Sequence, residues 1–133
     1  MKKLLLISAL LFSLNGWADW DLSNKNSRGD ITYIDSSSIR LVDDFLYAWV
    51  LTDWAYPQVG GLFYSAKAML RVDCKLQRMM VMDMILYSQN MGKGPPKEPS
   101  IQDKSQFGKN WSYTAPKSLW EATVQEICSH NIK

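Results

Sequence analysis

The feature that most constrains the fold is a run of closely spaced segments with strand periodicity. In DFLYAWVLTD, residues 44–53, apolar side chains occupy both faces of the two-residue period, which is typical of a central strand. YSAKAMLRVDC, residues 64–74, alternates apolar with polar side chains and predicts one dry and one wet face. RMMVMDMILYS, residues 78–88, and DITYID, residues 30–35, complete the set. Strands this close in sequence are expected to pair antiparallel.

The C-terminal region carries one helix signal. Ser118 followed by Glu121 forms a capping box. The apolar side chains after it recur at helical spacing, at Trp120, Val124, Ile127 and Cys128. Residues 88–110, rich in glycine, proline and lysine, predict a long exposed loop before this helix. The expected fold class is α+β, an antiparallel β-sheet with one C-terminal helix packed on one face.

The N-terminus has the pattern of a signal peptide. MKKLLLISALLFSLNGWA has two lysines, an apolar run, and the small residues Gly16 and Ala18 before a cleavage site. We predict a signal peptide at 1–18 and a single domain at 19–133. The apolar run from Leu4 to Leu14 is too short to cross about 30 Å of hydrocarbon. With no cysteine near the cleavage site, the mature protein is expected to be soluble, and periplasmic rather than at the cell surface or secreted.

Cleavage also changes the charge. The loss of Lys2 and Lys3 from the 15 basic residues leaves 13, which balance the 13 acidic ones. A neutral domain lacks the broad basic field that drives binding to nucleic acid or anionic lipid, so neither is an expected partner.

The two cysteines, Cys74 and Cys128, are expected to form a structural disulfide. An exported chain enters an oxidising compartment, where an even pair usually closes. This bond would tie the C-terminal helix to the end of the 64–74 strand. A reactive thiol pair is the weaker alternative, because redox motifs place two cysteines two residues apart.

Two short motifs have a functional and a structural interpretation. Arg28-Gly29-Asp30 is the tripeptide that integrins recognise, but Gly-Asp after a polar run is also ordinary turn chemistry, which we favour. A regular strand would place Met80, Met82 and Met84 on one face, about 6.6 Å apart. Their thioethers suit Cu(I), although methionines more often fill an irregular core. No metal or cofactor is therefore expected.

The stretch WVLTDWAYPQ, residues 49–58, supplies the candidate binding residues. Trp49 falls within the predicted central strand and is interpreted as core. Trp54 and Tyr56 follow it, and we place them in a turn before Pro57, where aromatic rings either line an interface or plug the space under a loop.

No catalytic constellation is recognisable. His130 lies near the end of the predicted helix, and the adjacent Asp43 and Asp44 suggest a solvated turn. We expect no enzyme activity.

The chain resembles the surface-adhesin protein E-like domain over residues 31–128, through the segments YIDSSSI, WVLTDWAYPQ, YSAK, DC, YSQNMGKG, a lone tryptophan at 111, PKS and the final EIC, in this order. The resemblance implies an antiparallel sheet with a C-terminal helix held by the cysteine pair, in a non-enzymatic envelope protein of a Gram-negative bacterium. The family takes its name from a lipid-anchored adhesin that binds host extracellular-matrix proteins. GPPKEP, residues 94–99, departs from the family where a hydrophobic strand would continue, which predicts a frayed edge.

These observations predict an exported, non-catalytic binding domain that uses Trp54, Tyr56 and the 88–110 loop. Its partner would be a host extracellular-matrix protein or an envelope protein. The alternatives are a periplasmic Cu(I)-handling protein and a structural envelope protein that assembles with itself. The sequence does not predict the oligomeric state.

Overall fold

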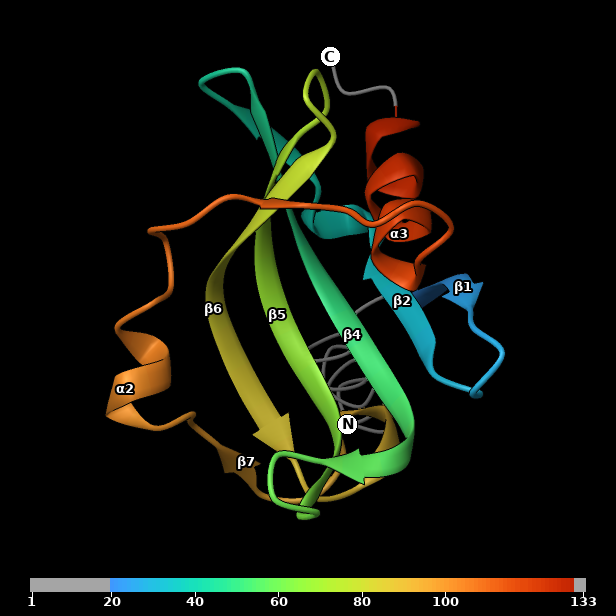
Figure 1. Cartoon of the computed structure of the whole chain (residues 1–133), viewed down its shortest axis with the longest axis vertical. Helices are drawn as coiled ribbons and strands as arrows, with labels where there is room; N and C mark the ends of the chain where they lie inside the picture. Colours follow the sequence, from blue (N-terminus) through green and yellow to red (C-terminus); the bar gives the residue numbers. More distant parts are fainter. Residues whose placement is uncertain (1–19, 131–133) are drawn as a thin grey trace, which may run out of the picture.

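The computed structural model describes residues 20–130 (Figure 1). The strands are β1 (Trp20–Lys25), β2 (Ile31–Asp35), β3 (Arg40–Val42), β4 (Phe45–Gln58), β5 (Phe63–Asp73), β6 (Arg78–Tyr87), β7 (Pro96–Lys97) and β8 (Ser112–Tyr113). The helical segments are the short 3-10 turns η1 (Ser36–Ser38) and η2 (Asn90–Gly92) and the α-helices α2 (Ile101–Lys104) and α3 (Leu119–Cys128). The predicted signal peptide, 1–18, lies outside the described residues.

The strands form one antiparallel sheet in the order β1-β2-β4-β5-β6-β7, with β3 paired to β4 and β8 paired to β6. The long strands β4 and β5 lie at its centre, as the apolar runs predict. At the β6 edge, β7 contributes only Pro96 and Lys97, opposite Tyr87 and Leu86. The edge is therefore as short as the prolines of 94–99 predict.

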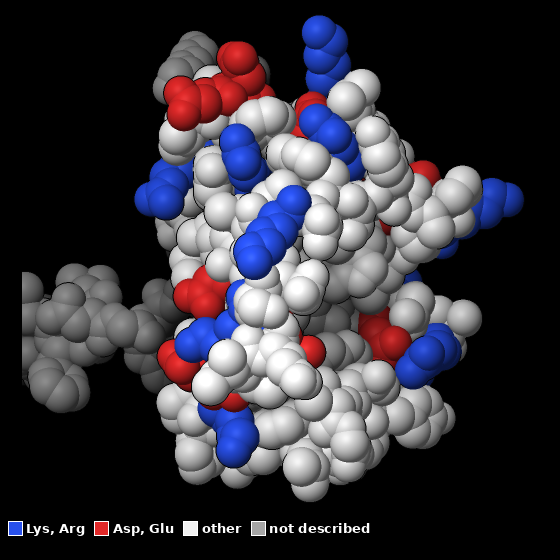
Figure 2. Space-filling model, turned by 60° about the vertical axis from the view of Figure 1, so that its left-hand side comes forward, with Lys and Arg blue, Asp and Glu red and all other residues white. Residues whose placement is uncertain are grey.

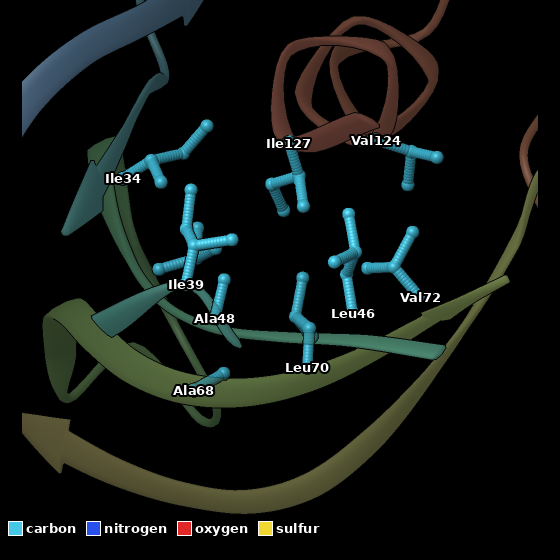
Figure 3. Packing of buried hydrophobic residues seen from close by; sticks show 10 residues of the cluster. Ile34, Ile39, Leu46, Ala48, Ala68, Leu70, Val72, Val124 and Ile127 are labelled. Carbon is cyan, nitrogen blue, oxygen red and sulfur yellow. The ribbon is translucent and has the colours of Figure 1, made fainter. Parts of the chain in front are cut away.

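One face of the sheet is covered by α3, which confirms the predicted α+β architecture. Figure 1 places α3 beside β1 and β2, and α2 on the other side of the molecule beyond β6. Figure 3 shows side chains from α3 and from the strands pointing toward one another. The buried cluster consists of Ile34, Ile39, Leu46, Ala48, Val50, Ala68, Leu70, Val72, Val124 and Ile127.

Trp49 is not part of this cluster, so its interpretation as core was wrong. Its neighbours Ala48 and Val50 face α3 and are fully buried, whereas Trp49 points to the opposite face and is half-buried. Both faces of β4 are apolar in sequence, but a helix covers only one of them.

Three local interactions hold α3 in place. Ser118 Oγ accepts a hydrogen bond from the Glu121 N–H at 3.1 Å, which confirms the predicted N-cap. Thr123 Oγ1 donates to the Leu119 carbonyl at 2.8 Å. Because this bond uses the only proton of the Thr123 hydroxyl, Thr123 Oγ1 accepts a hydrogen bond from Thr32 Oγ1, also at 2.8 Å. This second bond crosses the buried contact between α3 and β2.

The predicted disulfide joins Cys74 to Cys128, with 5.8 Å between the two Cα atoms and a sequence separation of 54. It connects the residue that follows β5 with the last residue of α3. The bond thus fixes the end of the helix to the sheet, as predicted.

The shared methionine face does not exist, because β6 carries a β-bulge. Asp83 lies opposite Met69 and Val81 lies opposite Leu70, so Met82 is an extra residue between these pairs. A one-residue insertion reverses the side-chain alternation beyond it. Met84 therefore lies opposite Ala68 on the α3 face, whereas Met80 lies opposite Arg71 on the other face. The Cu(I) hypothesis loses the geometry on which it depended.

Candidate binding surface

The two candidate binding residues lie in a strand and not in a turn. β4 continues through Trp54 and Tyr56 to Gln58, and the chain reverses only at Gly60 and Gly61. The strand tolerates Pro57 because its pairing with β5 is irregular between Asp53 and Gln58, so no regular ladder bond is lost there. The prediction that Trp54 and Tyr56 lie in a turn was therefore wrong.

The β4–β5 turn carries backbone strain. Gly60 and Gly61 have φ of 71° and 76°, which glycine adopts freely. Val59 has φ of 52°, which is an outlier for a β-branched residue. Hydrogen bonding from the Leu62 N–H to the Gln58 carbonyl, at 3.2 Å, closes the turn. Strain of this kind persists only where the surrounding structure determines it, and it clusters at functional sites.

Trp54 and Tyr56 have different environments. Trp54 is half-buried and packs against a second apolar cluster of Phe63, Ala66 and Leu86. Tyr56 is 62% exposed. Trp54 thus contributes packing, and the exposed ring of Tyr56 is the one available to a partner.

Tyr56 belongs to an exposed apolar group that we call the hairpin patch, consisting of Tyr56, Val59 and Leu62. Val59 is 53% exposed and Leu62 is 66% exposed. Figure 2 shows basic and acidic side chains interspersed over one side of the molecule. Its lower end, where Figure 1 places the β4–β5 turn and β7, is broadly uncharged.

A mainly apolar groove of about 360 Å³ adjoins the hairpin patch. Its lining comes from the β4–β5 turn, β6 and the long loop, at Val59, Met84, Leu86, Pro99, Asp103, Gln106 and Phe107. The sequence predicted the exposed loop but did not assign any of these residues to a groove, because the groove depends on contacts between distant segments. The proline run and Phe107 are the only local signals of it.

The long loop, predicted at 88–110, is anchored to the sheet. Asp53 Oδ1 accepts hydrogen bonds from Asn90 Nδ2 and the Met91 N–H, both at 2.8 Å. The Gly92 N–H donates to Ser65 Oγ at 2.9 Å. At the other end, the Gly108 N–H donates to the Val81 carbonyl at 2.8 Å. The loop wall of the groove is therefore held in place and includes the short helix α2.

The carboxylate of the Arg28-Gly29-Asp30 tripeptide is buried within a turn. Asp30 is 6% exposed, and its side chain accepts from the Ala55 N–H and from Asn26 Nδ2, both at 3.0 Å. Arg28 Nε lies 3.7 Å from the same side chain. An integrin would need this carboxylate free, so the geometry favours the turn interpretation.

These contacts also determine how Asp30 titrates. Burial raises the pKa of Asp30, but the hydrogen bonds from Ala55 and Asn26 and the charge of Arg28 outweigh it. The pKa therefore lies below its ordinary value of 3.8. A carboxylate with a lowered folded-state pKa stabilises the fold fully above the unfolded value, and that contribution is lost as pH falls through the folded value.

We expect Asp30→Asn to lower the free energy of unfolding at pH 7 by about 1 kcal/mol, because a neutral amide replaces a charged acceptor of two hydrogen bonds. The difference between variant and wild type should shrink as the pH falls below 4. Urea unfolding at pH 7 and at pH 3 measures both quantities. If the two proteins differed in free energy of unfolding as much at pH 3 as at pH 7, the stabilising effect would not come from the negative charge of Asp30.

Two of the remaining candidates lie in a turn, and His130 lies at the end of α3 beside Glu126 in a small pocket that Asp21 also lines. Asp43 and Asp44 form the β3–β4 turn and are exposed, as predicted. Within residues 20–130, no group of three or more His, Cys, Asp or Glu side chains is placed to hold a metal ion. Over the same residues, no helix is long and apolar enough to cross a membrane.

Comparisons with known proteins agree with this architecture. The family model for surface-adhesin protein E matches residues 20–129. A crystal structure of Haemophilus influenzae protein E superimposes with a TM-score of 0.60 and 17% identity, covering 86% of this chain and 91% of that one. Protein E from non-typeable Haemophilus influenzae gives a TM-score of 0.55 and 15% identity, with 86% and 78% covered. No curated protein matches the sequence.

Proposed function

The chain belongs to the surface-adhesin protein E family, and from this membership we propose that it is an exported, non-catalytic domain of the bacterial envelope that binds another protein. The observation that supports this proposal best is the hairpin patch beside the apolar groove. Exposed apolar side chains scattered singly are ordinary, but three on one hairpin, one of which also lines an apolar groove, are typical of an interaction site.

The geometry suggests how a partner would bind. Tyr56 offers a large amphipathic ring on the irregularly paired end of β4, and rings of this type contribute much of the binding energy of protein interfaces. An apolar side chain of the partner would enter the groove between Met84 and Phe107, while Asp103 and Gln106 offer hydrogen bonds at its side. The hydrogen bonds that anchor the loop reduce the conformational entropy lost on binding.

We further propose that residues 1–18 direct export and that the domain works in the periplasm. An envelope protein is then the partner, and a host extracellular-matrix protein is the alternative if the domain reaches the cell surface. Protease treatment of intact and lysed cells separates the two locations. A domain that the protease digests only after lysis is periplasmic. A domain that is digested on intact cells is at the cell surface, and its partner would then be a matrix protein.

We expect Tyr56→Ser combined with Leu62→Ser to weaken binding to the partner at least about tenfold, because both exposed side chains leave the centre of the interface. The partner is first identified by photo-crosslinking from position 62 in cells, and its affinity is then measured with purified proteins. Tyr113→Ser is the matched control, because Tyr113 is 67% exposed on β8, outside the hairpin patch.

Two outcomes would refute this assignment. One is equal crosslinking from positions 62 and 113. The other is an affinity that the double variant leaves unchanged while its thermal unfolding matches that of the wild type. In either case the binding surface lies elsewhere on the domain.

A further inference from the structure

The sheet face opposite α3 carries basic side chains stacked on aromatic rings. The Arg71 guanidinium lies 4.3 Å from the Phe45 ring centroid and 5.4 Å from that of Trp111. Arg78 stacks on Trp111 at 4.3 Å. Because Arg71 alternates with the buried Leu70, it points away from α3.

Lys67 is a further cation on β5, the strand that carries Arg71. Lys67 Nζ lies 5.2 Å from the Tyr87 ring centroid and 5.9 Å from the Trp20 ring centroid. Lys67 and Arg71 are four residues apart on one face of β5, which separates them by about 13 Å. Trp49 lies opposite Met69 and thus projects between them. The face therefore presents a line of two cations along β5, Lys67 and Arg71, with Trp49 beside it on the neighbouring strand β4.

A shallow pocket of about 230 Å³ opens on this face beside Lys67. Three aromatic side chains, Trp20, Trp49 and Tyr87, line this pocket, and Asp35 lines it as well. It is small for a drug-sized ligand but has room for a single ring of a longer molecule. Flat aromatic walls suit a ligand ring with an apolar face and polar edges.

The cations in this line have no carboxylate partner. Among residues 20–130, Arg78 forms an ion pair with Asp73 at 2.8 Å, whereas neither Lys67 nor Arg71 lies within 4.0 Å of a carboxylate. The Nε atom of Arg71 is buried with no hydrogen-bond partner in that part of the chain. That atom is closed to solvent, so an arriving anion would accept a charge-assisted hydrogen bond from the terminal guanidinium nitrogens of Arg71, which make no hydrogen bond within residues 20–130.

The nearby acidic groups are already engaged. The Asp35 carboxylate accepts from the Ser37 N–H and hydroxyl at 3.2 and 2.6 Å. The Asp83 carboxylate accepts from the Met84 N–H at 2.8 Å. Hydrogen bonds from neutral donors leave both carboxylates charged, so the anionic groups of a ligand would have to lie over Lys67 and Arg71 and away from Asp35 and Asp83.

We propose that this face binds an acidic polysaccharide. Trp49, with the aromatic walls of the pocket, stacks against sugar rings, and Lys67 and Arg71 bind carboxylate or sulfate groups on the chain. Two cations placed in a line suit an extended ligand with repeated charges, because one small anion would require them to converge. The balanced charge predicted for the mature domain disfavours nucleic acid, whose dense phosphates need many cations. This surface is separate from the hairpin patch, so the proposal does not depend on the protein-binding function.

Binding is measured with fluorescently labelled fragments of heparin, of hyaluronate and of neutral dextran, and with oligo-deoxythymidylate, at low salt. We expect capture of heparin or hyaluronate and none of dextran. Capture of heparin but not of hyaluronate identifies sulfate as the recognised group. Capture of both heparin and hyaluronate shows that carboxylate groups are sufficient for binding, because hyaluronate carries no sulfate. Lys67→Met and Arg71→Met should each weaken capture by about tenfold or more, the effect of losing one charge-assisted hydrogen bond.

The controls make the assignment specific. Lys97→Met removes one charge from the exposed β7 and should leave capture unchanged. Arg71→Lys keeps the charge and should retain most of the affinity. Comparison with Arg71→Met therefore shows whether the affinity is lost because the charge is removed or because the fold is disturbed. The proposal is overturned by a lack of capture of both acidic probes, by an equal loss in Lys97→Met, or by tighter capture of oligo-deoxythymidylate at the same residues.

Discussion

Replacing both Cys74 and Cys128 by alanine is expected to lower the free energy of unfolding by about 4 kcal/mol, the largest effect of any change considered for this domain. The bond closes a chain separation of 54 residues, and cross-linking a loop of this length removes much of the entropy of the unfolded chain. A small domain has about 5–15 kcal/mol of total stability, so the variant would be marginal. Urea unfolding of the purified domain measures the loss.

Reduced wild-type protein is the matched control for this variant, because it keeps both sulfur atoms and lacks only the bond between them. The two should unfold at similar urea concentrations, well below that of the oxidised domain. If the reduced protein were as stable as the oxidised one, α3 would be held by packing alone. The disulfide would then have no structural role of the kind assigned to it.

The parts of the fold that were predictable are those fixed by local patterns. Alternating side chains in residues 44–88 specify β4, β5 and β6, because each strand buries a face. The capping box at Ser118 and Glu121 specifies the start of α3, because it satisfies N–H groups that the first turn leaves free. The disulfide follows from two cysteines in an exported chain.

The errors arose where a single residue or a distant contact decides the geometry. The bulge at Met82 changes which methionines share a face, and no local signal in RMMVMDMILYS distinguishes it from a regular strand. Trp54 and Tyr56 were placed in a turn because Pro57 follows them, but irregular pairing lets β4 pass through this proline. Trp49 is only half-buried because α3 covers the other face of β4, and the sequence does not say which of the two apolar faces the helix covers.

The candidate site was predictable only in part. Tyr56 and the long loop were named from their chemistry, because an aromatic ring beside a glycine pair and a proline-rich segment are both visible in the sequence. The groove itself joins the β4–β5 turn to β6 and to residues 99–107. It forms because Asp53 and Val81 accept backbone hydrogen bonds from the loop, and no local pattern predicts these contacts.

The second large effect is expected from Ile127→Ala, which should lower the free energy of unfolding by about 3 kcal/mol. Ile127 is fully buried between α3 and the sheet, and its truncation leaves a cavity in a packed cluster. Gln125→Ala is the control, because Gln125 is exposed on the same helix and should change stability by less than about 0.5 kcal/mol. Urea unfolding compares the two variants directly.

The same substitution tests how packing and the disulfide share the docking of α3. Ile127 is adjacent to Cys128, so the cost of Ile127→Ala in the cysteine-free protein measures the coupling between packing and the bond. If packing holds the helix without the bond, Ile127→Ala costs about as much in the cysteine-free protein as in the wild type. A cost that vanishes there would mean that α3 leaves the sheet once the bond is absent, because a side chain already in water loses nothing when it is shortened. In that case the disulfide, and not the apolar cluster, determines whether α3 stays packed on the sheet.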